Sequence, residues 1–134
     1  MWQGSDLLAT GVASFGHISG VHYQNHPEWG GYTKTLLEDG KLPITRGLTP
    51  TPRQALIREM ILQLKKGYLD AGYFRDKYQA EIVDEWKAEW QSHIDDEMLS
   101  IKGDRIELTR KGFLHADGLL PAFFEPEHQG VRYT

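Results

Sequence analysis

The pattern of apolar and polar positions divides the chain into a less regular part and a regular part. Residues 1–50 contain most of the glycines, and within them the pattern predicts only one strand, at residues 6–12, and a short helix at residues 32–37. From residue 51 onward, apolar residues recur every three or four positions, as in amphipathic helices. We therefore expect an irregular Gly/Pro-rich arm over residues 1–50 and a folded domain over residues 51–134.

The first regular helix is marked at both ends. Thr51 is a suitable N-cap, Pro52 occupies the first helical position, and Gln54 completes a capping box. Gly67 follows the helix and suits a left-handed C-terminal cap. A short second helix is predicted over residues 71–78. The apolar stripe of the first helix consists of Leu56, Ile57, Met60, Ile61 and Leu64.

A third helix is predicted over residues 80–98, and its two tryptophans are one helical turn apart, so both should enter the same core. Alternating residues 99–109 on either side of Gly103-Asp104 predict a β-hairpin with a two-residue turn. Thr109 can cap a final helix over residues 110–120. The buried stripe of the third helix consists of Ile82, Val83, Trp86, Trp90 and Ile94.

Three helices, a hairpin and a closing helix predict the fold class: α+β, mostly α, with a winged-helix-like domain after the irregular arm. The apolar start of residues 119–128 predicts a tail whose Phe123 and Phe124 pack on the core. The length of 134 residues suits one small domain with an appended arm. No segment approaches the roughly 20 apolar residues of a membrane helix, and no signal peptide precedes the arm, so we expect a cytoplasmic protein.

The absence of cysteine narrows the chemistry of the chain. Without thiols it holds no disulfide, zinc–thiolate site or iron–sulfur cluster of its own. The net charge of −4 gives no general attraction for nucleic acid. The third helix would normally enter the DNA major groove, yet over residues 81–97 it is acidic, with Lys87 as its only Lys or Arg. We therefore predict no nucleic-acid partner and no resident metal.

Two motifs in the glycine-rich stretch are incomplete. Ser14 is centred in a segment close to the Gly-x-Ser-x-Gly elbow of serine hydrolases, but Val12 replaces the first glycine and no helix follows. Gly11 and Gly16 have the spacing of a phosphate loop, but the Lys is missing. The histidines of the stretch, which suit polar loop positions better than the convergent ligand set of a metal site, are His17, His22 and His26.

Four segments, in order over residues 5–124, carry a family resemblance. They are Asp6-Leu-Leu-x-x-Gly-Val-x-Ser14, Tyr23-x-Asn25, Leu42-Pro-Ile-Thr-Arg-Gly-Leu-Thr49 and Ile106-x-Leu-Thr-x-x-Gly-x-Leu114. The chain resembles the C-terminal third of the oxygen-independent coproporphyrinogen III oxidase-like family of radical S-adenosylmethionine (SAM) proteins. The first segment is similar to the last barrel strand and its glycine-rich loop, and the fourth to the closing hairpin and helix.

The resemblance implies a role in tetrapyrrole and heme metabolism. In the family, a barrel earlier in the chain binds a four-iron four-sulfur cluster that cleaves SAM, and the C-terminal domain covers the barrel mouth. This chain has no cysteine for the cluster, so the resemblance implies a substrate-side lid domain that is not catalytic alone. Its expected partners are the missing barrel and a tetrapyrrole. Whether the longer protein oxidises, degrades, methylates or carries the tetrapyrrole stays open.

The resemblance places the glycine-rich loop at the rim of the cofactor and substrate cavity. It puts Phe15 near a second SAM, and Arg46 is suited to a tetrapyrrole propionate or, equally, to an ion pair with Glu38 or Asp39. The alternative function is a winged-helix protein-interaction module without a ligand. The residues that the resemblance implies for cofactor or substrate binding are Gly11, Ser14, Phe15, Gly16, His17 and Arg46.

Overall fold

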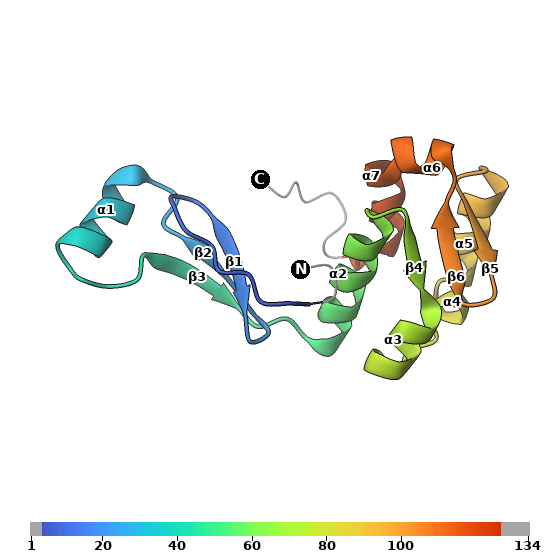
Figure 1. Ribbon diagram of the computed structural model, residues 1–134, viewed down its shortest axis with the longest axis horizontal. Coiled ribbons are helices and arrows are strands. Elements are labelled where there is room, and N and C mark those ends of the chain that lie inside the picture. The colour runs from blue at the N-terminus through green and yellow to red at the C-terminus, as the bar shows by residue number, and fades with distance from the viewer. Residues whose placement is uncertain (1–3, 127–134) are drawn as a thin grey trace. The chain divides into compact units, whose positions relative to one another are not determined.

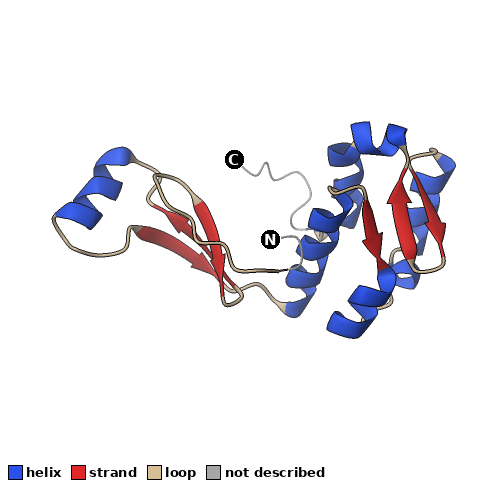
Figure 2. Cartoon of the chain, viewed as in Figure 1, coloured by secondary structure: helices blue, strands red, loops and turns tan. Residues whose placement is uncertain are grey.

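The computed structural model describes residues 4–126 and divides the chain into two compact units, Met1–Thr51 and Pro52–Thr134. The units contain helices and two small antiparallel sheets, and helix is the more abundant element (Figures 1 and 2). The predicted α+β, mostly α class is therefore confirmed. The winged-helix assignment stays a prediction. Within residues 4–126, every helix is too short or too polar to cross a bilayer.

The first unit is a three-stranded antiparallel sheet with one helix. The sheet order is β1-β2-β3, and the helix α1 joins β2 to β3 (Figure 1). The predicted short helix at residues 32–37 is confirmed and begins three residues earlier. The elements are β1 (Phe15–Ile18), β2 (Val21–Asn25), α1 (Trp29–Leu37) and β3 (Ile44–Leu48).

The strand predicted at residues 6–12 is wrong. In that segment only Leu7 pairs with a strand, through an isolated bridge to His17. Gly11 has a φ of +100° and Ala13 a φ of +59°, values that take the chain out of extended geometry. The segment is therefore a loop, and the strands lie after it.

The second unit contains most of the helices and a three-stranded antiparallel sheet of order β4-β6-β5 (Figure 1). Its elements are α2 (Pro52–Leu64), β4 (Tyr68–Asp70), α3 (Ala71–Tyr78), α4 (Ile82–Glu85), α5 (Lys87–Asp95), β5 (Leu99–Lys102), β6 (Arg105–Leu108), α6 (Arg110–Leu114), α7 (Ala116–Leu119) and the 3-10 helix η1 (Leu120–Phe123). The predicted helix that begins at Pro52 is confirmed and ends at Leu64, and the predicted helix over residues 71–78 is confirmed as well. The hairpin is also confirmed, with its turn at Gly103-Asp104. The short strand β4 was not predicted.

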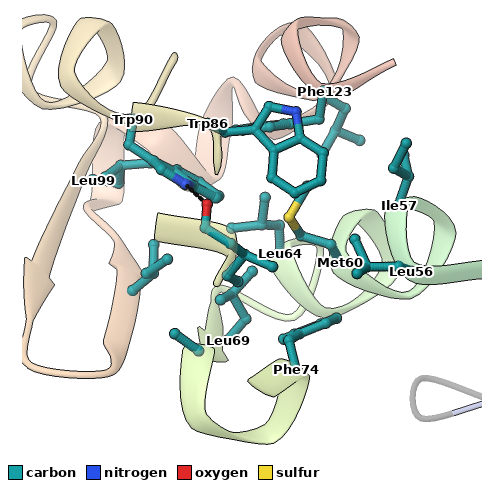
Figure 3. Close-up of a cluster of buried hydrophobic side chains, with 14 residues drawn as sticks. Leu56, Ile57, Met60, Leu64, Leu69, Phe74, Trp86, Trp90, Leu99 and Phe123 are labelled. Atoms are coloured by element: carbon teal, nitrogen blue, oxygen red, sulfur yellow. Dashed lines mark hydrogen bonds between the residues drawn. The ribbon is translucent and has the colours of Figure 1, made fainter. Parts of the chain in front are cut away.

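The third helix is interrupted, which corrects the prediction of one continuous helix over residues 80–98. The break lies at Trp86, between α4 and α5. The indole N–H of Trp90 donates to the Ile82 carbonyl at 2.8 Å, whereas the helical bond to that carbonyl from the Trp86 N–H is longer, at 3.3 Å (Figure 3). We attribute the break to this shared acceptor, since the side-chain bond weakens the helical one.

The final helix is interrupted too, so the prediction of one helix over residues 110–120 is wrong. The helix α6 ends before His115, and the chain continues as α7 and then as η1. Its predicted cap is confirmed, because the Thr109 side chain accepts a hydrogen bond from the Gly112 N–H at 3.0 Å. A Cβ at Gly112 would lie 1.8 Å from the Met98 carbonyl oxygen, so this turn packs directly on the preceding backbone.

The apolar core lies in the second unit (Figure 3). Trp90 is 1% exposed, and its ring centroid lies 4.4 Å from that of Phe123. Phe124 is partly buried against the same cluster, so the predicted packing of the tail is confirmed; residues 127 and 128 of that tail lie outside the described part. The buried core residues include Leu56, Ile57, Met60, Leu64, Leu69, Phe74, Ile82, Trp86, Leu99 and Ile106.

The first unit differs because, within residues 4–126, it contributes no residue to the buried hydrophobic core, and Pro43 is its only buried residue with an apolar side chain. Its apolar side chains are instead exposed in part or largely, with Phe15 60%, Trp29 70% and Leu37 82% exposed. Its sheet and helix are held mainly by backbone pairing and polar contacts rather than by a core of their own.

Candidate functional site

The glycine-rich loop is anchored by Asn25, which is 4% exposed. Its side-chain amide nitrogen lies 3.3 Å from the Ala9 carbonyl, 3.1 Å from the Gly11 carbonyl and 3.2 Å from the Ser14 hydroxyl. The Ser14 hydroxyl in turn donates to the Gly11 carbonyl at 2.5 Å. Ser14 therefore belongs to the framework of the loop. Because its hydroxyl donates to backbone and not to a histidine, it is not arranged as a hydrolase nucleophile.

Two tyrosines hold the same loop from the sheet and from α1. The Ala9 N–H donates to the Tyr23 hydroxyl at 2.8 Å, and the Gly11 N–H donates to the Tyr32 hydroxyl at 3.1 Å. Gly11 has a φ of +100°, which a residue with a Cβ rarely adopts. The loop is thus held by side chains from the sheet and from α1. A loop held in this way loses less conformational entropy when it binds a ligand.

Gly16 serves the loop indirectly. It is buried on β1, opposite Tyr23 on β2, and a Cβ added to it would lie 2.2 Å from the Tyr23 ring carbon Cζ. The tyrosine ring therefore lies directly across the glycine. Only a residue without a side chain lets the Tyr23 hydroxyl reach the backbone of Ala9.

The strand register brings three of the predicted site residues to one face of the sheet. Phe15 pairs with Gln24, which pairs with Arg46, and directly opposed residues share a face. His17 is two residues from Phe15 on β1, so it lies on that face as well. We call this surface the β1–β3 face; its members are Phe15, His17, His22, Gln24, Arg46 and Leu48.

The β1–β3 face combines apolar, cationic and imidazole groups. Phe15 is 60% and Leu48 61% exposed. Arg46 is exposed too, and it lies two residues before Leu48 on β3. The alternative ion pair of Arg46 with Glu38 or Asp39 is absent from residues 4–126. The guanidinium is therefore available to an external anion, and Gly11, Ser14 and Gly16 shape the loop beside the face rather than line it.

Comparison with known proteins finds a similar sequence and a similar solved structure, while no family model matches the chain. Over 112 residues, the chain is 28% identical to the oxygen-independent coproporphyrinogen III oxidase of Helicobacter pylori, covering 81% of this chain and 24% of that protein. The solved structure of coproporphyrinogen III oxidase from Escherichia coli, described as a radical SAM enzyme, matches with a TM-score of 0.73. That match covers 89% of this chain and 28% of the enzyme, at 22% identity.

The chain resembles part of the oxygen-independent coproporphyrinogen III oxidases. The resemblance to the C-terminal domain of this family, predicted from the four sequence segments, is thus confirmed, and the structural match shows the fold. The chain spans about a quarter of the length of each of these two proteins. The roles of the individual site residues remain predictions.

The sequence analysis did not predict the polar cluster of the second unit. Glu59, on α2, is 2% exposed, and its carboxylate accepts hydrogen bonds from Tyr73, from Lys77 at 2.9 Å and from Tyr78. The only local signal was a glutamate within an apolar stripe at helical spacing, which is equally typical of a half-exposed helix edge. Because all the hydrogen-bond partners of Glu59 lie in the second unit, we interpret the cluster as structural.

The pKa values of the cluster follow from its geometry. Burial alone would raise the pKa of Glu59, but the donated bonds from Lys77, Tyr73 and Tyr78 outweigh it and lower that pKa below its ordinary value of 4.5. Burial and the neighbouring carboxylate raise the pKa of Tyr78. Burial opposes the charged form of Lys77, yet its bond to Glu59 leaves the lysine pKa raised. Glu59 and Lys77 are therefore an ion pair at neutral pH.

Proposed function

We propose that this chain is the substrate-side lid domain of a coproporphyrinogen III oxidase-like radical SAM protein that handles a tetrapyrrole. The observation that carries the proposal is the β1–β3 face, on which Phe15, His17 and Arg46 lie together. A tetrapyrrole is a large, mainly apolar ring system with carboxylate side chains. Exposed Phe15 and Leu48 suit its apolar part, and the Arg46 guanidinium suits a carboxylate.

The chemistry of the radical belongs elsewhere in the longer protein. A thiolate-held iron–sulfur cluster does not fit this chain, which contains no cysteine. We therefore assign the cluster and SAM to the remainder of the protein, and we derive no catalytic step for the residues of this domain. Its own task in the proposal is to bind, orient and enclose the substrate.

The exposed apolar side chains of the first unit support the proposal that this domain has a partner. Its residues contribute no aliphatic or aromatic side chain to the buried core of the described chain, and several of its large apolar side chains are exposed. Exposed apolar surface of this kind marks interaction sites. We propose that the barrel of the longer protein, which the oxidase relatives' greater length makes room for, packs on part of it.

Titration with metal-free coproporphyrin III in the presence of EDTA tests the proposal. We expect saturable quenching of porphyrin fluorescence, weakened about tenfold in Arg46→Ala and in Phe15→Ala, which corresponds to about 1.4 kcal/mol for each lost contact. Arg110→Ala and Phe113→Ala, exposed residues of the same types in the second unit, are matched controls that should leave the affinity unchanged. Equal effects of test and control variants, or no saturation, would contradict the proposal.

A second candidate function is a protein-interaction module without a ligand. An open groove of about 360 Å³ in the second unit favours it, since the groove includes Tyr68, Phe113 and Leu114, which are 42%, 55% and 74% exposed. No saturable porphyrin binding by the unmodified chain, together with a partner that protects the amides around Phe113 from hydrogen exchange, would support this function over the first.

A further inference from the structure

Two histidines lie opposite each other on neighbouring strands of the first unit. His17 on β1 pairs with His22 on β2, and their ring centroids are 4.6 Å apart with an angle of 42° between the ring planes. The two rings are therefore neighbours, tilted against each other rather than stacked flat. Both residues belong to the β1–β3 face, and both are partly buried.

The backbone explains why the rings come so close. The His17 N–H donates to the Leu7 carbonyl at 2.9 Å, and the His17 carbonyl accepts from the Leu7 N–H at 2.6 Å. Because both backbone groups of His17 pair with Leu7, His17 and His22 form a non-hydrogen-bonded antiparallel pair. Opposed side chains are nearest to each other in pairs of this type.

One nitrogen of the pair is buried and without a partner. The Nδ1 atom of His17 has almost no exposed surface and makes no hydrogen bond within residues 4–126. Buried polar atoms normally have a partner, so an unpartnered imidazole nitrogen beside a second imidazole is suited to accept an external one. Imidazole nitrogen is the ligand most often used for Zn²⁺, Ni²⁺ and Cu²⁺ in proteins.

We propose that His17 and His22 together chelate a divalent first-row transition-metal ion. No cluster of three or more His, Cys, Asp or Glu side chains exists in the described part of the chain, so the two imidazoles are the protein ligands and water or an external donor completes the coordination. Such a site holds the ion on the hairpin and leaves positions open. The inference goes beyond the proposed function, because it requires no tetrapyrrole.

Calorimetric titration of the tag-free 134-residue chain with Ni²⁺ at pH 7.5, in a chelator-free buffer, tests the site. We expect one ion per chain and a loss of affinity of about tenfold or more in His17→Gln and in His22→Gln, since even indirect supports of a metal ligand cost that much. His115→Gln, an exposed histidine of the second unit, is the matched control and should bind as the unmodified chain does.

A spectroscopic measurement separates loss of a ligand from loss of the fold. The electron paramagnetic resonance spectrum of the unmodified chain with one equivalent of Cu²⁺ should show coupling to two imidazole nitrogens, and to one in each glutamine variant. Equal Ni²⁺ affinity in all four proteins, or a Cu²⁺ spectrum without paired nitrogen coupling, would overturn the site. Because the porphyrin titration is run in EDTA, either proposal can fail while the other stands.

Discussion

At the scale of single residues, a few polar side chains determine local structure far from their own positions in the sequence. Asn25 organises the loop that precedes β1 through contacts with Ala9, Gly11 and Ser14. In the second unit, the buried carboxylate of Glu59 accepts hydrogen bonds from Lys77 and from two tyrosine hydroxyls. Each of these groups is costly to bury alone and stable only because its partners are complete.

Replacing Glu59 by Ala should destabilise the second unit by about 1–3 kcal/mol, because Lys77 and the tyrosine hydroxyls lose their shared acceptor. Glu107→Ala, at an exposed carboxylate paired only on the surface with Arg105, should change stability by about 0.5 kcal/mol or less. Urea unfolding followed by circular dichroism measures both. A similar loss of unfolding free energy in the two variants would show that the buried cluster stabilises the chain no more than a surface ion pair does.

Glu59 also makes the unfolding free energy of the chain depend on pH in the acidic range. Its pKa is lower in the folded chain than the ordinary value of 4.5, so its stabilising effect is complete above that pH and is lost as the pH falls toward the folded pKa. The unfolding free energy of the unmodified chain should therefore fall more steeply below pH 4.5 than that of Glu59→Gln. Parallel slopes would contradict the assignment.

At the scale of elements, close backbone packing decides which glycines tolerate a side chain. Gly16→Ala should displace the Tyr23 ring and release the Ala9 amide, because the new Cβ would lie 2.2 Å from that ring. Gly47→Ala is the matched control on β3, where the nearest atom, the His22 carbonyl oxygen, is 4.0 Å away. Amide hydrogen exchange at Ala9 should accelerate in the first variant only; acceleration in both would refute this account.

The closing helices offer a second pair of glycines with opposite expectations. Gly112→Ala places its Cβ 1.8 Å from the Met98 carbonyl oxygen and should destabilise the second unit by about 1–3 kcal/mol. Gly118→Ala, in α7 with no atom within 4 Å of the new Cβ, should stabilise it by about 0.5–1 kcal/mol. Thermal unfolding distinguishes them by the sign of the shift in midpoint, and shifts of the same sign would be inconsistent with the packing described.

At the scale of the whole molecule, the two units are stabilised by different means. The second has a core built around Trp90, Phe123 and Met60, whereas the first has no aliphatic or aromatic residue in the buried core of residues 4–126. Local opening is easiest where few apolar contacts are buried. In the isolated chain, amides of β1, β2 and β3 should therefore exchange much faster than those of α2 and β6. Equal protection in the two units would argue against a missing partner.

Prediction from sequence succeeded where the signal is local. The ends and stripe of α2, the bounds of α3, the hairpin turn at Gly103-Asp104 and the Thr109 cap all follow from neighbouring residues. The sheet of the first unit was missed because its strands mix glycine, histidine and polar residues, with none of the simple alternation of a half-buried strand. The candidate residues came from the family resemblance, which says nothing about the face each one occupies.

By itself, then, the sequence determined the α+β class, the helices and hairpin with local signals, the lack of thiols and the resemblance to the oxidases. Only the tertiary structure decided that Phe15, His17 and Arg46 share a face while Ser14 belongs to the loop framework. It also decided where the third helix breaks and that Glu59 is buried with its partners. The reason is physical: caps, turns and periodicity act between neighbours, whereas strand register and buried polar contacts join residues that are distant in the chain.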